Sequence, residues 1–482
     1  MSYSPEKPNP NPPLKRPPSW PDLWLKNTKA LKHVVFTMQL QSLNKPDKTL
    51  IFDRPQSDRT LLLSDEILLH ILSKVPKSQQ NPNSLVCKRW LNLQGRLVRS
   101  LKVLDWEFLE SGRLVSRFPN LTHVDLVHGC LVSPRNSGIL LNHHRIVSIH
   151  IDSAFEAKGF IPKKYWLSNE VIDKGLKALA SGCPNLRKLA MIAASEMGLL
   201  NVAEECSTLQ ELELHRCSDN TLRAIAACEN LQVLKLIGNV DGLYSSLVSD
   251  IGLTILAQGC KRLVKLELSG CEGSFDGIKA IGQCCQMLEE LTLCDHRMDG
   301  GWLSALSYCE NLKTLRIRSC KVIDQSPGPD EYLGSCPALE KLHLQKCQLR
   351  DKRNVRALFM VCEAVREIVI QDCWGLDNDM FIMASTCRRV KSLSLEVCSL
   401  LTTGGLESLI FSWKEFQRLR VVSCNNIKDS EVSPALSTLF TVLKELKWRP
   451  DTKSLLSSTL VGTDMGKKGG KFFKRSRDLL SR

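Results

Sequence analysis

Hydrophobic and polar residues alternate along this chain in a short unit that recurs. From Cys336 to Cys347 the sequence follows the pattern C-x-x-L-x-x-L-x-L-x-x-C. The same Cys-to-Cys spacing of 11 residues returns at 206–217, 260–271, 309–320, 362–373 and 387–398. The L-x-L part alternates with period two, which predicts a short strand with one buried face. Apolar stretches between these segments, such as 249–260, predict helices.

The unit repeats with a nearly fixed period. Its first aliphatic position recurs mostly every 24 to 27 residues, at Leu209, Leu231, Leu263, Leu288, Leu312, Leu339, Val365, Val390, Phe416 and Leu443. A period of this length is typical of solenoids, and the L-x-x-L-x-L core resembles leucine-rich repeats. We therefore predict an α/β fold in which stacked repeats share one core. Parallel strands would line the concave face, and helices would cover the convex face.

Short acidic residues stand near the starts of several predicted helices. They are Asp173, Asp276, Asp299 and Asp379. A carboxylate at the residue before a helix can accept hydrogen bonds from the first free amide groups. We expect these residues to cap their own helices.

A different helical pattern precedes the repeats. The sequence LSDEILLHILSKVP runs from Leu63 to Pro76, and NSLVCKRW follows from Asn83 to Trp90. Ser64 is a good N-cap, and the acidic residues after it suit the positive end of a helix. The apolar positions form a stripe made of Leu63, Ile67, Leu68, Ile71, Leu72, Leu85, Val86 and Trp90.

The two motifs, at this spacing and before cysteine-type repeats, resemble the F-box, although Ser64 stands where that motif usually has Pro. A plain helical cap on the solenoid is the alternative. The whole chain resembles F-box/leucine-rich-repeat proteins, most of all those of plants. That resemblance implies that the stripe binds a Skp-type adaptor, which joins a cullin–RING ubiquitin ligase. The repeats would then hold a target protein. A small-molecule (hormone-like) receptor that uses the same ligase, and a scaffold without any ligase, remain open.

Residues for catalysis or metal binding do not stand out. The sequence has no nucleophile elbow, phosphate-binding glycine loop or H-E-x-x-H motif. Most of the 20 cysteines fall at the two repeat positions, where a small, weakly polar side chain suits a core. No Cys/His spacing is typical of zinc. We predict free structural thiols, no metal, no cofactor and no enzymatic activity of its own.

Charge and hydropathy limit the classes of partner that this chain is expected to bind. The formal net charge is +14, but residues 467–482 carry seven Lys or Arg and one Asp, so +6 of it belongs to the end of the chain. The repeats are therefore weak candidates for nucleic acid binding. No apolar run is long enough to span a bilayer, and the start lacks a signal-peptide pattern. We expect a cytosolic or nuclear protein, or both, with no membrane or nucleic acid partner.

Composition divides the chain into four regions. We predict a Pro-rich disordered arm with an apolar, Trp-containing segment over 1–59. The F-box follows over 60–104, the repeats over 105–449, and a disordered basic tail over 450–482. The stretch 127–182 interrupts the period, either as a loop that reaches the binding face or as a degenerate repeat with a surface loop.

Outward strand positions of the middle repeats give a candidate target site. Neighbouring parallel strands lie about 5 Å apart, so Arg316, Arg318, Lys341 and His343 should form one basic patch. Arg side chains grip carboxylates and phosphates with paired hydrogen bonds. We predict that an acidic or phosphorylated segment of the target binds there. The alternative is a solvated charged face without a partner.

Overall fold

The computed structural model describes residues 59–76, 82–127, 129–130, 140–142, 145–149, 167–192, 195–238 and 248–451. The chain divides into two units, Met1–Leu68 and Leu69–Arg482. Of the first unit the structure describes the 3-10 helix η1 (Arg59–Leu62) and the start of helix α2 (Asp65–Lys74). Nearly all of the predicted arm and basic tail, and about half of the predicted insertion, lie outside the described residues.

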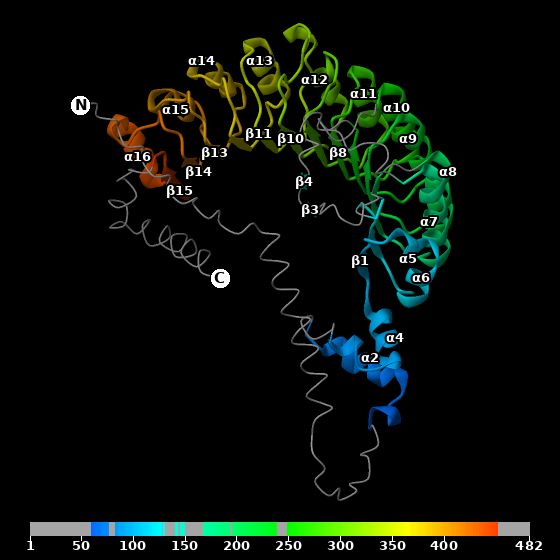
Figure 1. Ribbon diagram of the computed structural model, residues 1–482. Helices are drawn as coiled ribbons and strands as arrows, with labels where there is room; N and C mark the ends of the chain where they lie inside the picture. The colour runs from blue at the N-terminus through cyan, green and yellow to red at the C-terminus, as the bar shows by residue number, and fades with distance from the viewer. Residues whose placement is uncertain are drawn as a thin grey trace, which may run out of the picture. The chain divides into compact units, whose positions relative to one another are not determined.

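The second unit confirms the predicted parallel sheet. Within the described residues, 13 strands pair side by side in the order β1-β2-β5-β6-β7-β8-β9-β10-β11-β12-β13-β14-β15. Figure 1 shows this array as an arc with strands on the inner side and helices on the outer side, which is the predicted arrangement. The strands are β1 (Ser100–Lys102), β2 (His123–Asp125), β5 (Lys188–Ile192), β6 (Glu211–His215), β7 (Val233–Ile237), β8 (Lys265–Ser269), β9 (Glu290–Cys294), β10 (Thr314–Arg318), β11 (Lys341–Gln345), β12 (Glu367–Gln371), β13 (Ser392–Glu396), β14 (Arg418–Val422) and β15 (Glu445–Arg449).

Helices α2 and α4 (Lys88–Leu97) precede β1, and most later strands are connected by helices. These are α5 (Trp106–Glu110), α6 (Arg113–Arg117), α7 (Asn169–Gly182), α8 (Glu196–Glu205), α9 (Asp219–Ile225), α10 (Asp250–Gly259), α11 (Phe275–Cys284), α12 (Trp302–Ala305), α13 (Lys352–Val361), α14 (Asn378–Phe381), α15 (Thr403–Ile410) and α16 (Pro434–Val442). Short 3-10 turns complete several repeats: η4 (Leu306–Tyr308), η5 (Asp330–Tyr332), η6 (Ile382–Thr386) and η7 (Asp429–Glu431).

The core is a stack of aliphatic side chains that runs through every repeat. Leu315, Leu342 and Ile368 occupy the same register on adjacent strands, and each is fully buried. The first cysteine of a repeat closes the stack on the helix side. The Cys336 thiol, for example, donates to the carbonyl of Cys309 in the preceding repeat at 3.4 Å. No repeat buries its apolar face alone, so the array is stabilised by contacts between neighbours.

The prediction that these acidic residues cap their own helices is wrong in all four places. Asp173, Asp276 and Asp379 lie inside α7, α11 and α14, and the residue that precedes α12 is Gly301, not Asp299. Serine caps α11 instead: Ser274 accepts a hydrogen bond from the amide of Asp276. The first acidic residue of a helix binds the cap of the next repeat. Asp250 accepts from the amide of Ser274 at 2.7 Å and from its hydroxyl at 2.6 Å, and this pairing ties successive repeats together.

The predicted insertion contains ordinary and unusual parts. Its last residues form α7, a regular repeat helix. Upstream, β3 (Leu140–Asn142) and β4 (Arg145–Ile149) pair in an antiparallel ribbon that does not join the 13-stranded sheet. Strand β4 therefore lies in the predicted insertion but belongs to a separate ribbon.

Candidate protein-binding surfaces

Helix α2 is built from the first half of the two-part motif. Ser64 caps it by accepting from the amide of Ile67 at 3.4 Å, and Asp65 and Glu66 occupy its first turn. The predicted apolar stripe divides between two sides of this helix. Leu68 and Leu72 are each 1% exposed, whereas Ile67 and Ile71 are 52% and 45% exposed. Each pair is four residues apart and so shares one face. Leu68 and Leu72 thus pack within the chain, and Ile67 and Ile71 face solvent.

The second half of the motif runs from the turn before α4 into the first turn of that helix. Leu85 and Val86 are 85% and 60% exposed there. Trp90, in the first turn of α4, is half-buried, and so is Leu63. Sequence reasoning missed the exposed Leu61 and Leu62 in η1.

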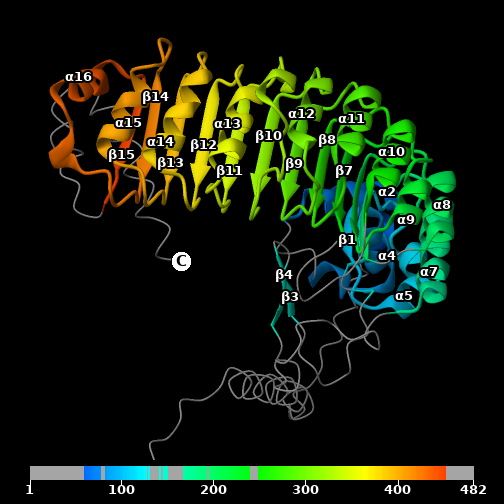
Figure 2. The ribbon, with the colours of Figure 1, turned by 90° about the horizontal axis from the view of Figure 1, so that it is seen from above.

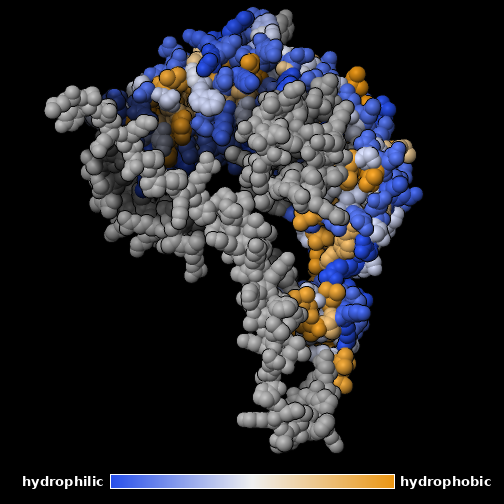
Figure 3. Space-filling view, in the orientation of Figure 1, coloured by the Kyte–Doolittle hydropathy of each residue, from blue (hydrophilic) through white to orange (hydrophobic). Residues whose placement is uncertain are grey.

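Figure 3 shows apolar surface over the part of the chain that holds α2 and α4. Exposed aliphatic side chains that gather in one short segment are typical of a protein contact. The exposed members of the stripe, Ile67, Ile71, Leu85 and Val86, are therefore the candidates for binding a partner.

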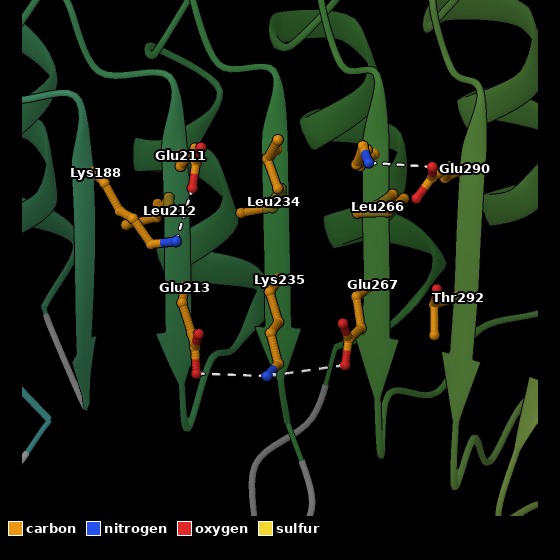
Figure 4. A pocket seen from close by; sticks show the side chains of 12 residues that line it. Lys188, Glu211, Leu212, Glu213, Leu234, Lys235, Leu266, Glu267, Glu290 and Thr292 are labelled. Carbon is orange, nitrogen blue, oxygen red and sulfur yellow. Dashed lines mark hydrogen bonds and ion pairs between the residues drawn. The ribbon is translucent and has the colours of Figure 1, made fainter. Parts of the chain in front are cut away.

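The concave face of β5–β9 carries charges that pair with one another (Figure 4). The ion pairs are Lys188–Glu211 at 2.8 Å, Lys235–Glu213 at 3.5 Å, Lys235–Glu267 at 3.9 Å and Lys265–Glu290 at 3.1 Å. They line a hollow of about 190 Å³. Pockets for small organic ligands usually hold roughly 300–1,000 Å³ and are mostly apolar. This hollow therefore gives no support to a hormone-like ligand.

Glu213 shows how strongly these charges are matched. Burial acts to raise the pKa of its carboxyl, but the His215 ring at 2.8 Å and the Lys235 ammonium outweigh burial and lower that pKa to about 2. The carboxylate stays ionised at neutral pH and is already neutralised by its neighbours. A ligand cation would have to displace them.

The structure brings the four predicted basic residues of β10 and β11 together, but two of them do not offer a free positive charge. Arg316 and His343 are register partners on adjacent strands. Arg318 is the next outward position after Arg316 on β10, and Lys341 is the outward position before His343 on β11. Lys341 pairs with Glu367 at 3.7 Å. Burial, and then the charge of Arg316, lower the pKa of His343, so its ring is neutral at pH 7. The predicted patch of four cations therefore reduces to two guanidinium groups that have no ion-pair partner among the described residues.

Sequence reasoning missed a hollow beside this pair. It holds about 250 Å³ and lies beyond the ends of β10 and β11. Its lining consists of Lys321, Val322, Ile323, Gln348, Leu349, Arg350, Asp351, Asn354 and Val355. The available signal was the apolar and basic residues that follow the second repeat cysteine, at Lys321–Val322 and Leu349–Arg350.

The remaining chemical groups point to structure. All 20 cysteines are free thiols, and burial raises the pKa of Cys336, for example, to about 12. In the part of the chain that the structure describes, no three His, Cys, Asp or Glu side chains are grouped as a metal site. Nor does any described helix have the length and apolar character needed to cross a bilayer.

Comparison with known proteins finds relatives whose names are those of F-box/LRR-repeat proteins. The chain is 24% identical over 338 residues to human F-box/LRR-repeat protein 12, which covers 64% of this chain and 95% of the relative. It is 24% identical over 311 residues to the cattle protein of the same name, covering 59% and 87%. No family model matches. These relatives support an F-box/LRR family, and since both are mammalian the resemblance to plant members stays a prediction.

Among solved structures the chain is similar to an internalin, InlF, of Listeria monocytogenes, with a TM-score of 0.39 and 15% identity over 80% of this chain and 95% of the other. A complex of TLR13 with the RNA ssRNA13 matches with a TM-score of 0.44 and 18% identity, over 75% and 48%. The yeast Rad7 and Elc1 complex matches with a TM-score of 0.32 and 13% identity, over 90% and 99%.

Proposed function

We propose that this chain is the substrate-recognition subunit of an SCF-type, cullin–RING ubiquitin ligase. Residues 60–104 act as an F-box that docks on a Skp-type adaptor, and the adaptor links the chain to a cullin. The repeats over 105–449 bind the target protein. The observation that carries the proposal is the exposed apolar set Ile67, Ile71, Leu85 and Val86, which lies within the F-box-like motif. The F-box/LRR relatives support it at the level of the family.

The mechanism is positional and needs no catalytic residue in this chain. Ubiquitin transfer would be carried out by the ligase, while the repeats hold the target within its reach. Binding both partners at once turns an encounter in solution into a reaction at high effective concentration. Such a role requires a cytosolic or nuclear location.

Adaptor binding tests the proposal. The variant Ile67→Asp with Ile71→Asp should lose copurification with the Skp-type adaptor, because two charges would be buried at the contact without partners. Both residues are exposed, so the variant should keep its melting temperature. Leu68→Asp with Leu72→Asp is a poor test, since these side chains are buried and the change should unfold the segment.

A matched control is Ile251→Asp in α10. Ile251 is 68% exposed, as apolar as the residues tested, and lies in a repeat helix. This variant should bind the adaptor as the wild type does. If the folded Ile67/Ile71 variant also binds undiminished, the F-box assignment fails, and a scaffold without a ligase becomes the better description.

A further inference from the structure

Strand β10 differs from β5–β9, because the cations on its concave face are not paired with carboxylates among the described residues. Arg316 and Arg318 are two residues apart, so both side chains point to the same side of the sheet with Cα atoms roughly 6.6 Å apart. Among the described residues no carboxylate forms an ion pair with either guanidinium. Their register partners on β9 are Thr292 and Cys294, which carry no charge at neutral pH. The two arginines therefore form a compact site with a charge of +2.

We propose that this site binds a phosphorylated side chain of the target protein; the inference rests on the proposed function. A phosphoryl group carries a charge of about −1.5 to −2 at pH 7 and three strong acceptor oxygens. Two guanidinium forks can meet that charge and several of those oxygens at once. A single carboxylate would leave one arginine without a partner.

The neighbouring strands favour a compact anion over a long acidic run. Glu290 lies on the adjacent strand β9, Glu267 lies on β8 beyond it, and Glu367 lies on β12 on the other side. Each of these carboxylates already pairs with a lysine on the same face, so among the described residues these outward positions offer an extended acidic segment no unpaired cation. A single phosphorylated residue places its charge on β10 alone.

The hollow beyond β10 and β11 gives the same segment a second contact. Figure 2 shows the ends of these strands at one edge of the sheet. Lys321 follows Arg318 by three residues, so the hollow begins no more than about 11 Å away. Val322, which is 44% exposed, and the buried Leu349 offer apolar walls. The nearby carboxylate of Asp351 already accepts hydrogen bonds from the amides of Arg353 and Asn354. We expect an aliphatic target side chain to enter this hollow.

Peptide pools test the inference on the full chain. Each pool fixes phosphoserine, glutamate or serine at its centre, fixes leucine about three residues away on either side, and randomises the other positions. Fluorescence anisotropy then compares three proteins: the wild type, Arg316→Ala with Arg318→Ala, and the control Lys235→Ala with Lys265→Ala. The control removes two cations from the same face where each is already paired.

The wild type should bind the phosphoserine pool at least about tenfold more tightly than the other two pools, as expected for charge-assisted hydrogen bonds. The double arginine variant should lose this preference, and the lysine control should keep it. Inorganic phosphate should compete with the phosphoserine pool for binding to the wild-type protein. Equal binding of the glutamate and phosphoserine pools, or an unchanged double arginine variant, would overturn the inference. Adaptor copurification is independent of both outcomes, so the proposed function can stand if this inference fails.

A second variant tests the hollow separately. Val322→Gln keeps both arginines and changes an exposed side chain. It should keep the preference for phosphoserine but lose the preference for pools with leucine over otherwise identical pools with alanine. If the leucine preference survives, the hollow is not part of the site.

Discussion

The concave faces of β5–β9 and of β10–β11 share one backbone and one register but differ in their outward charges. In the first region Lys235 lies between Glu213 and Glu267, and its ammonium nitrogen is 3.5 and 3.9 Å from their carboxylate oxygens. In the second region Arg316 and Arg318 have no acidic partner among the described residues. Inward positions build the same core in both regions, so recognition can vary along this array without any change of fold.

The largest effect should come from the inward positions and should be equal in the two regions. Leu342→Ala in β11 and Leu234→Ala in β7 each truncate a buried leucine. Each should lower the free energy of unfolding by about 2–5 kcal/mol, because a cavity remains in a stack that cannot collapse. Denaturant melts would measure this. A cost confined to one region would contradict the view that both share one core.

That division explains what the sequence could and could not predict. Strand positions follow from period-two leucines, because burial leaves little choice of face. The sequence identifies which residues point outward, but it cannot predict whether their side chains are charged or already paired. Whether His343 is charged depends on how deeply its ring is buried and on the distance to Arg316, and Lys341 is neutralised by a residue of the following repeat.

Helix α2 shows the same limit on a smaller scale. The apolar stripe over Ile67–Leu72 follows from the spacing of apolar residues. Spacing alone cannot show which of them pack inside the protein and which are exposed to solvent. That outcome depends on tertiary packing, which buries Leu68 and Leu72 and leaves Ile67 and Ile71 exposed. The hollow beside β10 was missed for a related reason: its walls come from turns of two separate repeats and from the start of α13.

Low pH should weaken the junction between the two regions. His296 follows β9, and its ring packs edge-on against Trp302 with centroids 5.3 Å apart. Burial lowers its pKa to about 4, although Cys347 and Asp324 act in the opposite direction. The unfolded chain, with a pKa near 6.5, then binds more protons between these values. Stability is therefore complete above about pH 6.5 and is lost as the pH falls towards 4, by up to about 3 kcal/mol.

Replacing the titrating ring tests this assignment. His296→Gln should lower the stability at pH 7, since a packed ring is lost, but should flatten the dependence of the unfolding free energy between pH 6.5 and 4. Urea melts at several pH values would show the slope. An unchanged slope would assign the acid sensitivity to other groups.

A single new carboxylate should make the second region resemble the first. Thr292 on β9 is the register partner of Arg316, so Thr292→Glu places an acid beside that guanidinium. The arginine would remain but would be paired, and binding of the phosphoserine pool should fall by roughly tenfold, or about 1.4 kcal/mol. Thr292→Gln is the matched control with the same length and no charge. Equal losses in both variants would indicate that bulk, and not pairing, caused the effect.

The smallest effect on binding should come from the reverse exchange, which should make the first region resemble the second. Glu213→Gln with Glu267→Gln removes both partners of Lys235 and leaves its ammonium unpaired. The variant should also lower the melting temperature at pH 7, because the ionised carboxyl of Glu213 contributes to stability above about pH 4.5. Below about pH 4.5 the wild type should also lose the contribution of Glu213, because its folded pKa is depressed to about 2, whereas the variant should not. The freed lysine should give the phosphoserine pool a weak second site that Arg316→Ala with Arg318→Ala does not remove. No such binding would mean that one ammonium cannot replace the paired guanidinium groups of β10, and that geometry as well as charge defines the site.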